Sequence, residues 1–224
     1  MAIAITKPSS QIGNTSNIAV YSMAPSFLPT ANSRLIVFAH ATGTVLGTIT
    51  GAGGLSWSVI QSMDPQALGS SSRILMADAG GNPSSVAINV DYTGDNATGC
   101  CAVALQVTGQ EPYIRQIAAV NSVANNPALT FPLAVDSNNA YMIGVVTSQQ
   151  PVFTAPAGWT TVAASYGTPT TGLFVGYRAG GETASTFVFS TGNVNVLGIF
   201  GVELWASGAI PVVDPMGMSG VYGA

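Results

Sequence analysis

The sequence predicts an all-β protein made of two tandem β-sandwich or jelly-roll-like copies, followed by an irregular C-terminal arm. Three observations lead to this prediction. Short apolar runs rich in β-branched and aromatic residues recur at about ten-residue spacing. The chain contains 26 glycines and 13 prolines, which leave little room for long helices. The residues around Trp57 and Trp159 open two similar series of segments, about 100 positions apart.

Three features keep the two series in register. Each begins with a tryptophan, continues to an Ala-Gly-Gly segment that starts at Ala79 or Ala179, and closes at a glycine after an apolar strand. A repeat held over about 100 residues indicates an internal duplication of one small domain. We therefore divide the chain into a first copy, residues 1–109, a second copy, residues 110–208, and an extended arm, residues 209–224.

In the first copy, strands are expected where apolar runs lie between turn residues. These runs are residues 35–39, 57–61, 86–92 and 101–107. A short helix is expected at 64–68, where Asp64 can cap and Pro65 fits the first turn. Residues 6–17 are expected to form a lead-in arm that neighbouring subunits order.

The second copy repeats this rhythm, and residues 141–146 match the strand that begins at Leu35. Further strands are expected at 128–133, directly after Trp159, and at 186–190. About six or seven strands per copy is typical of a β-sandwich or jelly roll.

The arm lies outside the repeat. Its prolines and glycines oppose regular structure, although many of its residues are apolar, which is unusual for a solvated tail. Two interpretations remain open: a frayed terminus that covers its own domain, or an arm that lies on a neighbouring subunit. The candidate subunit contacts are Ile210, Val212, Val213, Met216, Met218 and Tyr222.

The composition excludes several function classes. Only 6% of the residues are charged, where about 25% is usual, and the net charge is −4. The five basic residues are scattered, so no patch for nucleic acid is expected. The apolar runs are far shorter than the roughly 20 residues that span a bilayer, so we expect no membrane partner. The N-terminus lacks the features of a secretory signal, which predicts synthesis in a cytoplasm.

Catalytic and metal-binding chemistry has little support, and we predict no enzyme activity and no cofactor. His40 is the only histidine and ends an apolar strand, which favours a structural role. The copies do not share charges, since Asp78 aligns with Arg178. Cys100 and Cys101 are adjacent, so we expect one buried thiol and one partly exposed thiol rather than a disulfide or metal site.

The three tryptophans separate into two kinds. Trp57 and Trp159 occupy equivalent positions, which predicts a core role in each sandwich. Trp205 aligns with Gln106 and therefore belongs to one copy only. Trp205 is the candidate aromatic for a ligand or a subunit contact.

Three motifs of the second copy together resemble a recurrent β-sandwich module of bacteriophage structural proteins and some bacterial surface proteins. They are Pro156–Trp159, Tyr177–Gly180 and Val202–Trp205. The resemblance covers residues 110–208, and residues 1–109 match more loosely because Gly-Gly-Leu-Ser precedes Trp57. It implies a virion or surface component and transfers no catalytic residue.

The leading hypothesis is a non-enzymatic phage virion structural protein, most specifically a capsid decoration (cement) protein. It would bind its own copies and other virion proteins, such as the major capsid protein. A chain with so few charges leaves strand edges undefended, which a repetitive assembly would bury. The alternative is a tail-fibre or baseplate adhesin that binds host-surface carbohydrate through Trp205, Tyr166 or Tyr177. A third hypothesis, a polysaccharide depolymerase, needs two acids about 5–10 Å apart.

Overall fold

The computed structural model describes residues 2–14, 16, 18–42, 49–51, 54–63, 70–91, 99–121, 126–148, 152–166, 171–191 and 196–208. All structural statements below concern these residues. The short helix expected at 64–68 and the whole arm, residues 209–224, lie outside them.

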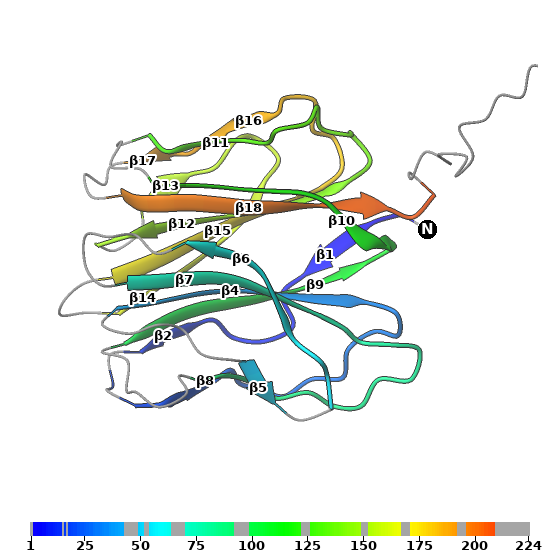
Figure 1. Ribbon diagram of the computed structural model, residues 1–224, viewed down its shortest axis with the longest axis vertical. Coiled ribbons are helices and arrows are strands. Elements are labelled where there is room, and N and C mark those ends of the chain that lie inside the picture. Colours follow the sequence, from blue (N-terminus) through cyan, green and yellow to red (C-terminus); the bar gives the residue numbers. More distant parts are fainter. Residues whose placement is uncertain are drawn as a thin grey trace, which may run out of the picture.

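The described chain is all-β, and two large antiparallel sheets face each other at its centre (Figure 1). The first sheet has the order β1 (Ala4–Thr6), β9 (Cys100–Thr108), β4 (Arg34–Thr42), β7 (Ser70–Asp78), β6 (Ser58–Met63), and β2 (Ile12–Asn14) also pairs with β9. The second has the order β10 (Gln110–Asn121), β18 (Val196–Ala206), β12 (Ala140–Thr147), β15 (Thr171–Ala179), β14 (Thr160–Tyr166).

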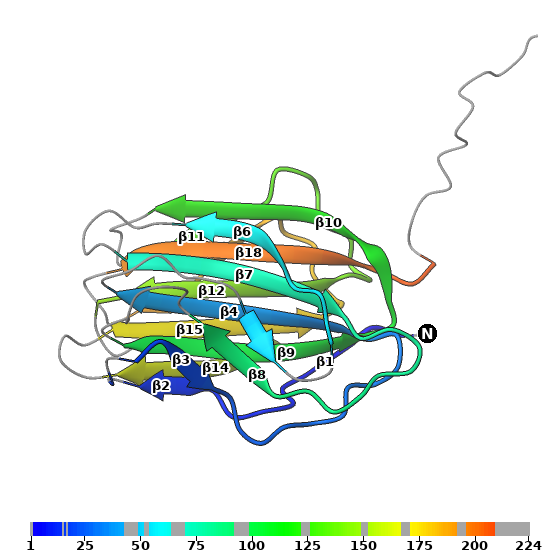
Figure 2. The same cartoon turned by 60° about the horizontal axis from the view of Figure 1, so that its bottom comes forward.

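Small sheets cover the outer face of each large sheet, so the molecule has four β layers (Figures 1 and 2). On the first half lie β3 (Val20–Ser22), β8 (Ile88–Asp91) and β5 (Ile49–Gly51). On the second half lie the pairs β11 (Ala128–Thr130) with β16 (Thr186–Val188), and β13 (Phe153–Thr154) with β17 (Ser190–Thr191). Each half is therefore a sandwich, and the halves pack through their large sheets.

Strand alternation explains why three cores form. On β4, Ile36 and Phe38 belong to the cluster between the large sheets, while Val37 and Ala39 belong to the cluster beneath the small sheet. Successive side chains of a strand point to opposite faces, so a strand buried on both sides is apolar throughout. A third cluster fills the outer sandwich of the second half.

The two large sheets pack directly against each other. The rings of Phe38 and Phe200 approach with centroids 5.4 Å apart across the central layer. Gly144 of β12 makes room for them, because a Cβ atom there would lie 2.7 Å from the Phe38 ring. The sequence boundary at Gly109 thus separates two halves that share one core.

Both halves have the same strand order, which is what a duplication would produce; the duplication itself remains an inference from the sequence. The sheet register corrects the alignment of the last strand. Leu35 pairs with Gln106, and its counterpart Tyr141 pairs with Glu203. Glu203, rather than Trp205, therefore occupies the position of Gln106.

The expectation that neighbouring subunits order residues 6–17 was wrong at Thr6 and at residues 12–14. The backbone of Thr6 pairs with that of Gln106, and residues 12–14 pair with residues 100–102. These segments complete the first sheet within their own chain, because the edge of β9 offers unpaired backbone groups that a short strand can satisfy.

Candidate functional site

The edge strand β10 is the most distinctive feature of the second half. It is 12 residues long and pairs with β18 on one side. No strand in the described part of the chain pairs with its other side. After two register shifts near its start, its pairing runs regularly from Gln116 to Asn121. The backbone of this stretch is therefore an open edge to which another strand can add.

The corresponding edge of the first half is built differently. There the strand is divided into β1 and β2, which both pair with β9. Between them lie residues 7–11, which include Lys7 and Pro8. Lysine, proline and short strands are the usual means by which proteins block edge-to-edge pairing. One of two equivalent edges is thus divided by residues 7–11. The other is the single strand β10, whose first part carries Pro112 and two register shifts and whose pairing is regular from Gln116 to Asn121.

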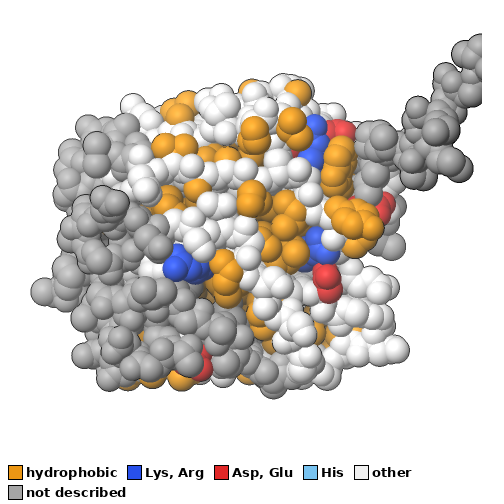
Figure 3. Space-filling view, viewed as in Figure 1, with side chains coloured by type: hydrophobic (Ala, Val, Ile, Leu, Met, Phe, Trp, Pro, Cys, Tyr) orange, Lys and Arg blue, Asp and Glu red, His pale blue; other side chains and the backbone are white. Residues whose placement is uncertain are grey.

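Apolar side chains are exposed along the continuous edge. Tyr113, Ile117 and Val120 of β10 are exposed, as is Val59 of β6, the edge strand of the first sheet. β6 and β10 lie side by side (Figures 1 and 2). Figure 3 shows hydrophobic side chains gathered where Figure 1 draws these two strands, with basic and acidic side chains at the border of this area. We call the surface formed by these four residues the edge surface.

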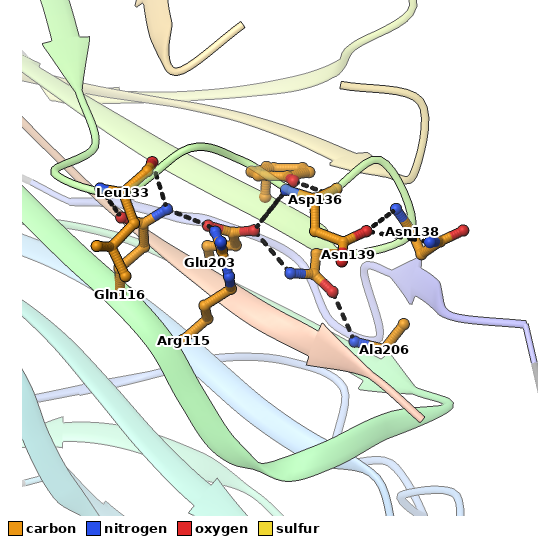
Figure 4. Close-up of polar contacts among 9 residues, drawn as sticks. Arg115, Gln116, Leu133, Asp136, Asn138, Asn139, Glu203 and Ala206 are labelled. Carbon is orange, nitrogen blue, oxygen red and sulfur yellow. Dashed lines mark hydrogen bonds and ion pairs between the residues drawn. The ribbon is translucent and has the colours of Figure 1, made fainter. Parts of the chain in front are cut away.

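Behind β10 lies a buried carboxylate, Glu203 of β18 (Figure 4). Its Oε2 accepts a hydrogen bond from Arg115 Nη1 at 2.7 Å and another from Gln116 Nε2. Its Oε1 accepts from Asn139 Nδ2 at 2.7 Å, the Tyr141 hydroxyl at 3.1 Å and the backbone N–H of Asp136 at 3.2 Å. A buried charge persists only when it is paired and hydrogen-bonded in this way.

This network fixes the connection between β11 and β12. Gln116 also bonds both backbone groups of Leu133, donating to the carbonyl at 3.2 Å and accepting from the N–H at 2.8 Å. Burial, followed by the charge of Glu203, raises the pKa of Tyr141 far above its ordinary value. The Tyr141 hydroxyl therefore stays protonated and acts as a donor. With every contact committed to structure, Glu203 is a scaffold carboxylate.

Trp205 lies beside the network, half-buried, with the Arg115 guanidinium 4.9 Å from its ring centroid. A cation held over the ring face covers part of the surface on which a sugar would stack. Its role as a ligand or interface aromatic stays a prediction. Trp57 and Trp159 both pack against the outer core of their own half, which confirms their core role.

His40 and the cysteines are core residues. His40 is fully buried, its Nδ1 lies 2.8 Å from Ser72 Oγ, and burial lowers its pKa to about 4. Cys100 and Cys101 form no disulfide and face opposite cores. The expectation that one thiol is partly exposed was wrong, because β9 lies between the central layer and a small sheet and is covered on both faces.

Other candidate chemistry is sparse in the described part of the chain. No group of three histidine, cysteine, aspartate or glutamate side chains there could hold a metal ion. No helix there is long and apolar enough to cross a membrane. A hollow of about 400 Å³ is lined by Tyr177, Thr160 and Arg178, among others. The arm residues from Ile210 to Tyr222 and the side chain of Tyr166 lie outside the described residues.

No protein-family model, curated protein or solved structure matches this chain.

Proposed function

We propose that this chain is a non-enzymatic structural protein of a virion, which assembles through the open edge of β10. The observation that carries the proposal is the contrast between equivalent edges: residues 7–11, with Lys7 and Pro8, divide the first, while β10 pairs regularly from Gln116 to Asn121. A long exposed edge with apolar side chains invites aggregation unless a partner covers it. A strand edge of this kind is therefore expected where another strand pairs with it.

The low charge supports the same conclusion. With only 6% charged residues, the protein has little electrostatic repulsion to keep copies apart. The more specific assignment, a bacteriophage capsid decoration (cement) protein, rests on the resemblance of residues 110–208 to phage structural modules. Its partners are then its own copies and other virion proteins such as the major capsid protein. Its location is the virion, after synthesis in the host cytoplasm.

The test is the mass in solution, by light scattering across a concentration series. Val120→Lys places a charge on the open edge and should shift the protein towards monomer. Val188→Lys is the matched control, because Val188 is 46% exposed, against 44% for Val120, but lies on β16 of a small outer sheet. A wild-type monomer at every concentration, or equal effects of both variants, would refute assembly through β10.

A second candidate, a tail-fibre or baseplate adhesin for host-surface carbohydrate, is favoured by the hollow at Tyr177. There a half-buried aromatic ring stands beside Thr160 and Arg178, a combination that suits sugar hydroxyls. Binding on a glycan array that Tyr177→Ala abolishes, by a protein that stays monomeric, would favour the adhesin. Silence on the array, with a concentration-dependent mass, would favour the structural protein.

A further inference from the structure

A small cavity lies where the two halves join, at the start of β10. Its volume is about 240 Å³. Three segments line it: residues 32–34 before and at the start of β4, Asp78 and Gly80 after β7, and Gln110 and Pro112 of β10. Neither the β10 edge from Gln116 to Asn121 nor the Glu203 network contributes to it.

Three buried polar atoms around this cavity have no hydrogen-bond partner in the described part of the chain. They are Ser33 Oγ, Arg34 Nη1 and Gln110 Oε1. Buried polar groups are almost always paired, because leaving one unsatisfied forfeits its hydration without return. Three such atoms at one cavity indicate an occupant that forms hydrogen bonds.

The remaining bonds of these residues define the chemistry of the occupant. Arg34 Nε donates to Asp78 Oδ1 at 2.7 Å, so its charge is already compensated. Arg34 Nη2 donates to the Pro112 carbonyl at 2.7 Å, and Gln110 Nε2 donates to the Asn32 carbonyl at 3.0 Å. What stays open is a guanidinium donor, a hydroxyl and an amide acceptor. A neutral peptide group matches them, with its carbonyl towards Arg34 and Ser33 and its N–H towards Gln110.

The chain itself supplies such a segment at this corner. The N–H of Ser207 donates to the Gly109 carbonyl at 2.8 Å, and that of Gly208 donates to Glu111 Oε1 at 2.7 Å. The sequence then continues through residues 209–224, enough to span roughly 50 Å at about 3.3 Å per residue. The arm therefore starts beside Glu111, which lies between Gln110 and Pro112 of the cavity lining.

We propose that the cavity receives a main-chain segment of the C-terminal arm, residues 209–224, from a second copy of the protein. The inference rests on the proposed assembly function and names the receiving surface for the arm. Because each arm begins next to its own cavity, a two-fold axis near this corner brings each arm to the cavity of its partner. In the sequence, Ile210, Val212 and Val213 are the apolar residues of the arm that follow Gly208 most closely.

Mixed cysteine cross-linking tests the proposal with the full-length chain. One population carries Ser33→Cys in the cavity, and the other carries a cysteine at position 210, 212 or 213. After mixing and oxidation, a reducible covalent dimer of one chain of each kind is expected for at least one position. The native thiols of Cys100 and Cys101 are buried and provide no background. Pro112→Cys, at the cavity rim, is a second receiving position if Ser33→Cys does not fold.

Val188→Cys is the control receiver, since Val188 is far more exposed than Ser33 but lines no part of this cavity. Equal cross-linking to Val188→Cys would overturn the proposal. A third protein that carries both cysteines in one chain tests the intramolecular alternative. A cross-link within that chain, with no mixed dimer from the two single-cysteine populations, would also overturn the proposal, because the arm would then occupy its own cavity. A wild-type protein that oligomerises without mixed cross-links refutes this inference alone, whereas a monomer at every concentration removes the proposed function as well.

Discussion

Replacing Glu203 with alanine tests whether the buried network supports the second half. The substitution removes the acceptor of five hydrogen bonds, from Arg115, Gln116, Asp136, Asn139 and Tyr141. The guanidinium that remains is only 13% exposed, so water can solvate it only in part. Breaking a buried ion pair by removing one partner costs about 3–5 kcal/mol.

The neutral donors add to this cost to different extents. Gln116 keeps its bond to the Leu133 carbonyl, while the side-chain amide of Asn139 loses the acceptor that Glu203 provides. Each unsatisfied donor costs about 1 kcal/mol or more, and water that enters the space left by the carboxylate recovers part of it. We therefore expect Glu203→Ala to lower the free energy of unfolding by about 4–6 kcal/mol.

Urea unfolding measures this difference, with Gln106→Ala as the control from the first half. Gln106 holds the equivalent register position but makes two exposed hydrogen bonds to Thr30, worth about 1 kcal/mol together. If the two variants unfold within about 1 kcal/mol of each other, the carboxylate does not organise the loop and the reasoning fails.

Three further predictions concern single positions. His40→Leu should reduce the dependence of the free energy of unfolding on pH. Burial lowers the pKa of His40 from an ordinary 6.5 to about 4, so its contribution to stability is complete above pH 6.5 and falls by about 2–3 kcal/mol as the pH drops towards 4. If the free energy of unfolding in urea changes equally for variant and wild type between pH 7.5 and pH 4.5, this prediction is wrong. Gly144→Ala should cost about 1–3 kcal/mol in the same assay, because the added Cβ meets the Phe38 ring at 2.7 Å. Trp205→Leu should lower the free energy of unfolding by about 0.5–1 kcal/mol, because the contact with Arg115 is lost. If the variant weakens the free energy of self-association by more than it lowers the free energy of unfolding, Trp205 lies in an interface.

Many strands could be predicted from the sequence because a strand buried on both faces is a run of apolar residues. The apolar run at 35–39 lies within β4, and that at 101–107 lies within β9, both covered on two faces. β10 gave no such signal, since Gln110–Asn121 mixes Glu, Pro, Arg and Gln with apolar residues. An edge strand faces solvent along one side and carries bulges, so neither an apolar run nor a clean alternation is required of it.

The candidate site was predictable only in outline. Glu203 is a charge within an apolar strand, which implies that it is buried and paired. Its partners come from β10, β12 and the connection between β11 and β12, and no local pattern identifies them. Counting back from Gly109 and Gly208 misplaced Trp205 by two residues, because the chain between Glu203 and Gly208 is two residues longer than that between Gln106 and Gly109.

Comparison of the two halves shows which features are not part of the shared scaffold, and these features lie together around β10. Among the described residues, only the second half has an undivided edge strand, a fully buried carboxylate behind it, and an arginine held over a tryptophan. A network that only stabilised a sandwich would be equally useful in the first half, where Gln106 makes a simpler contact at the same position. Glu203 instead fixes Arg115 and Gln116, which lie on β10 itself, and so holds the edge strand at the point where its regular pairing begins. Rigid presentation lowers the entropic cost of adding a strand to that edge, which links the buried network to assembly.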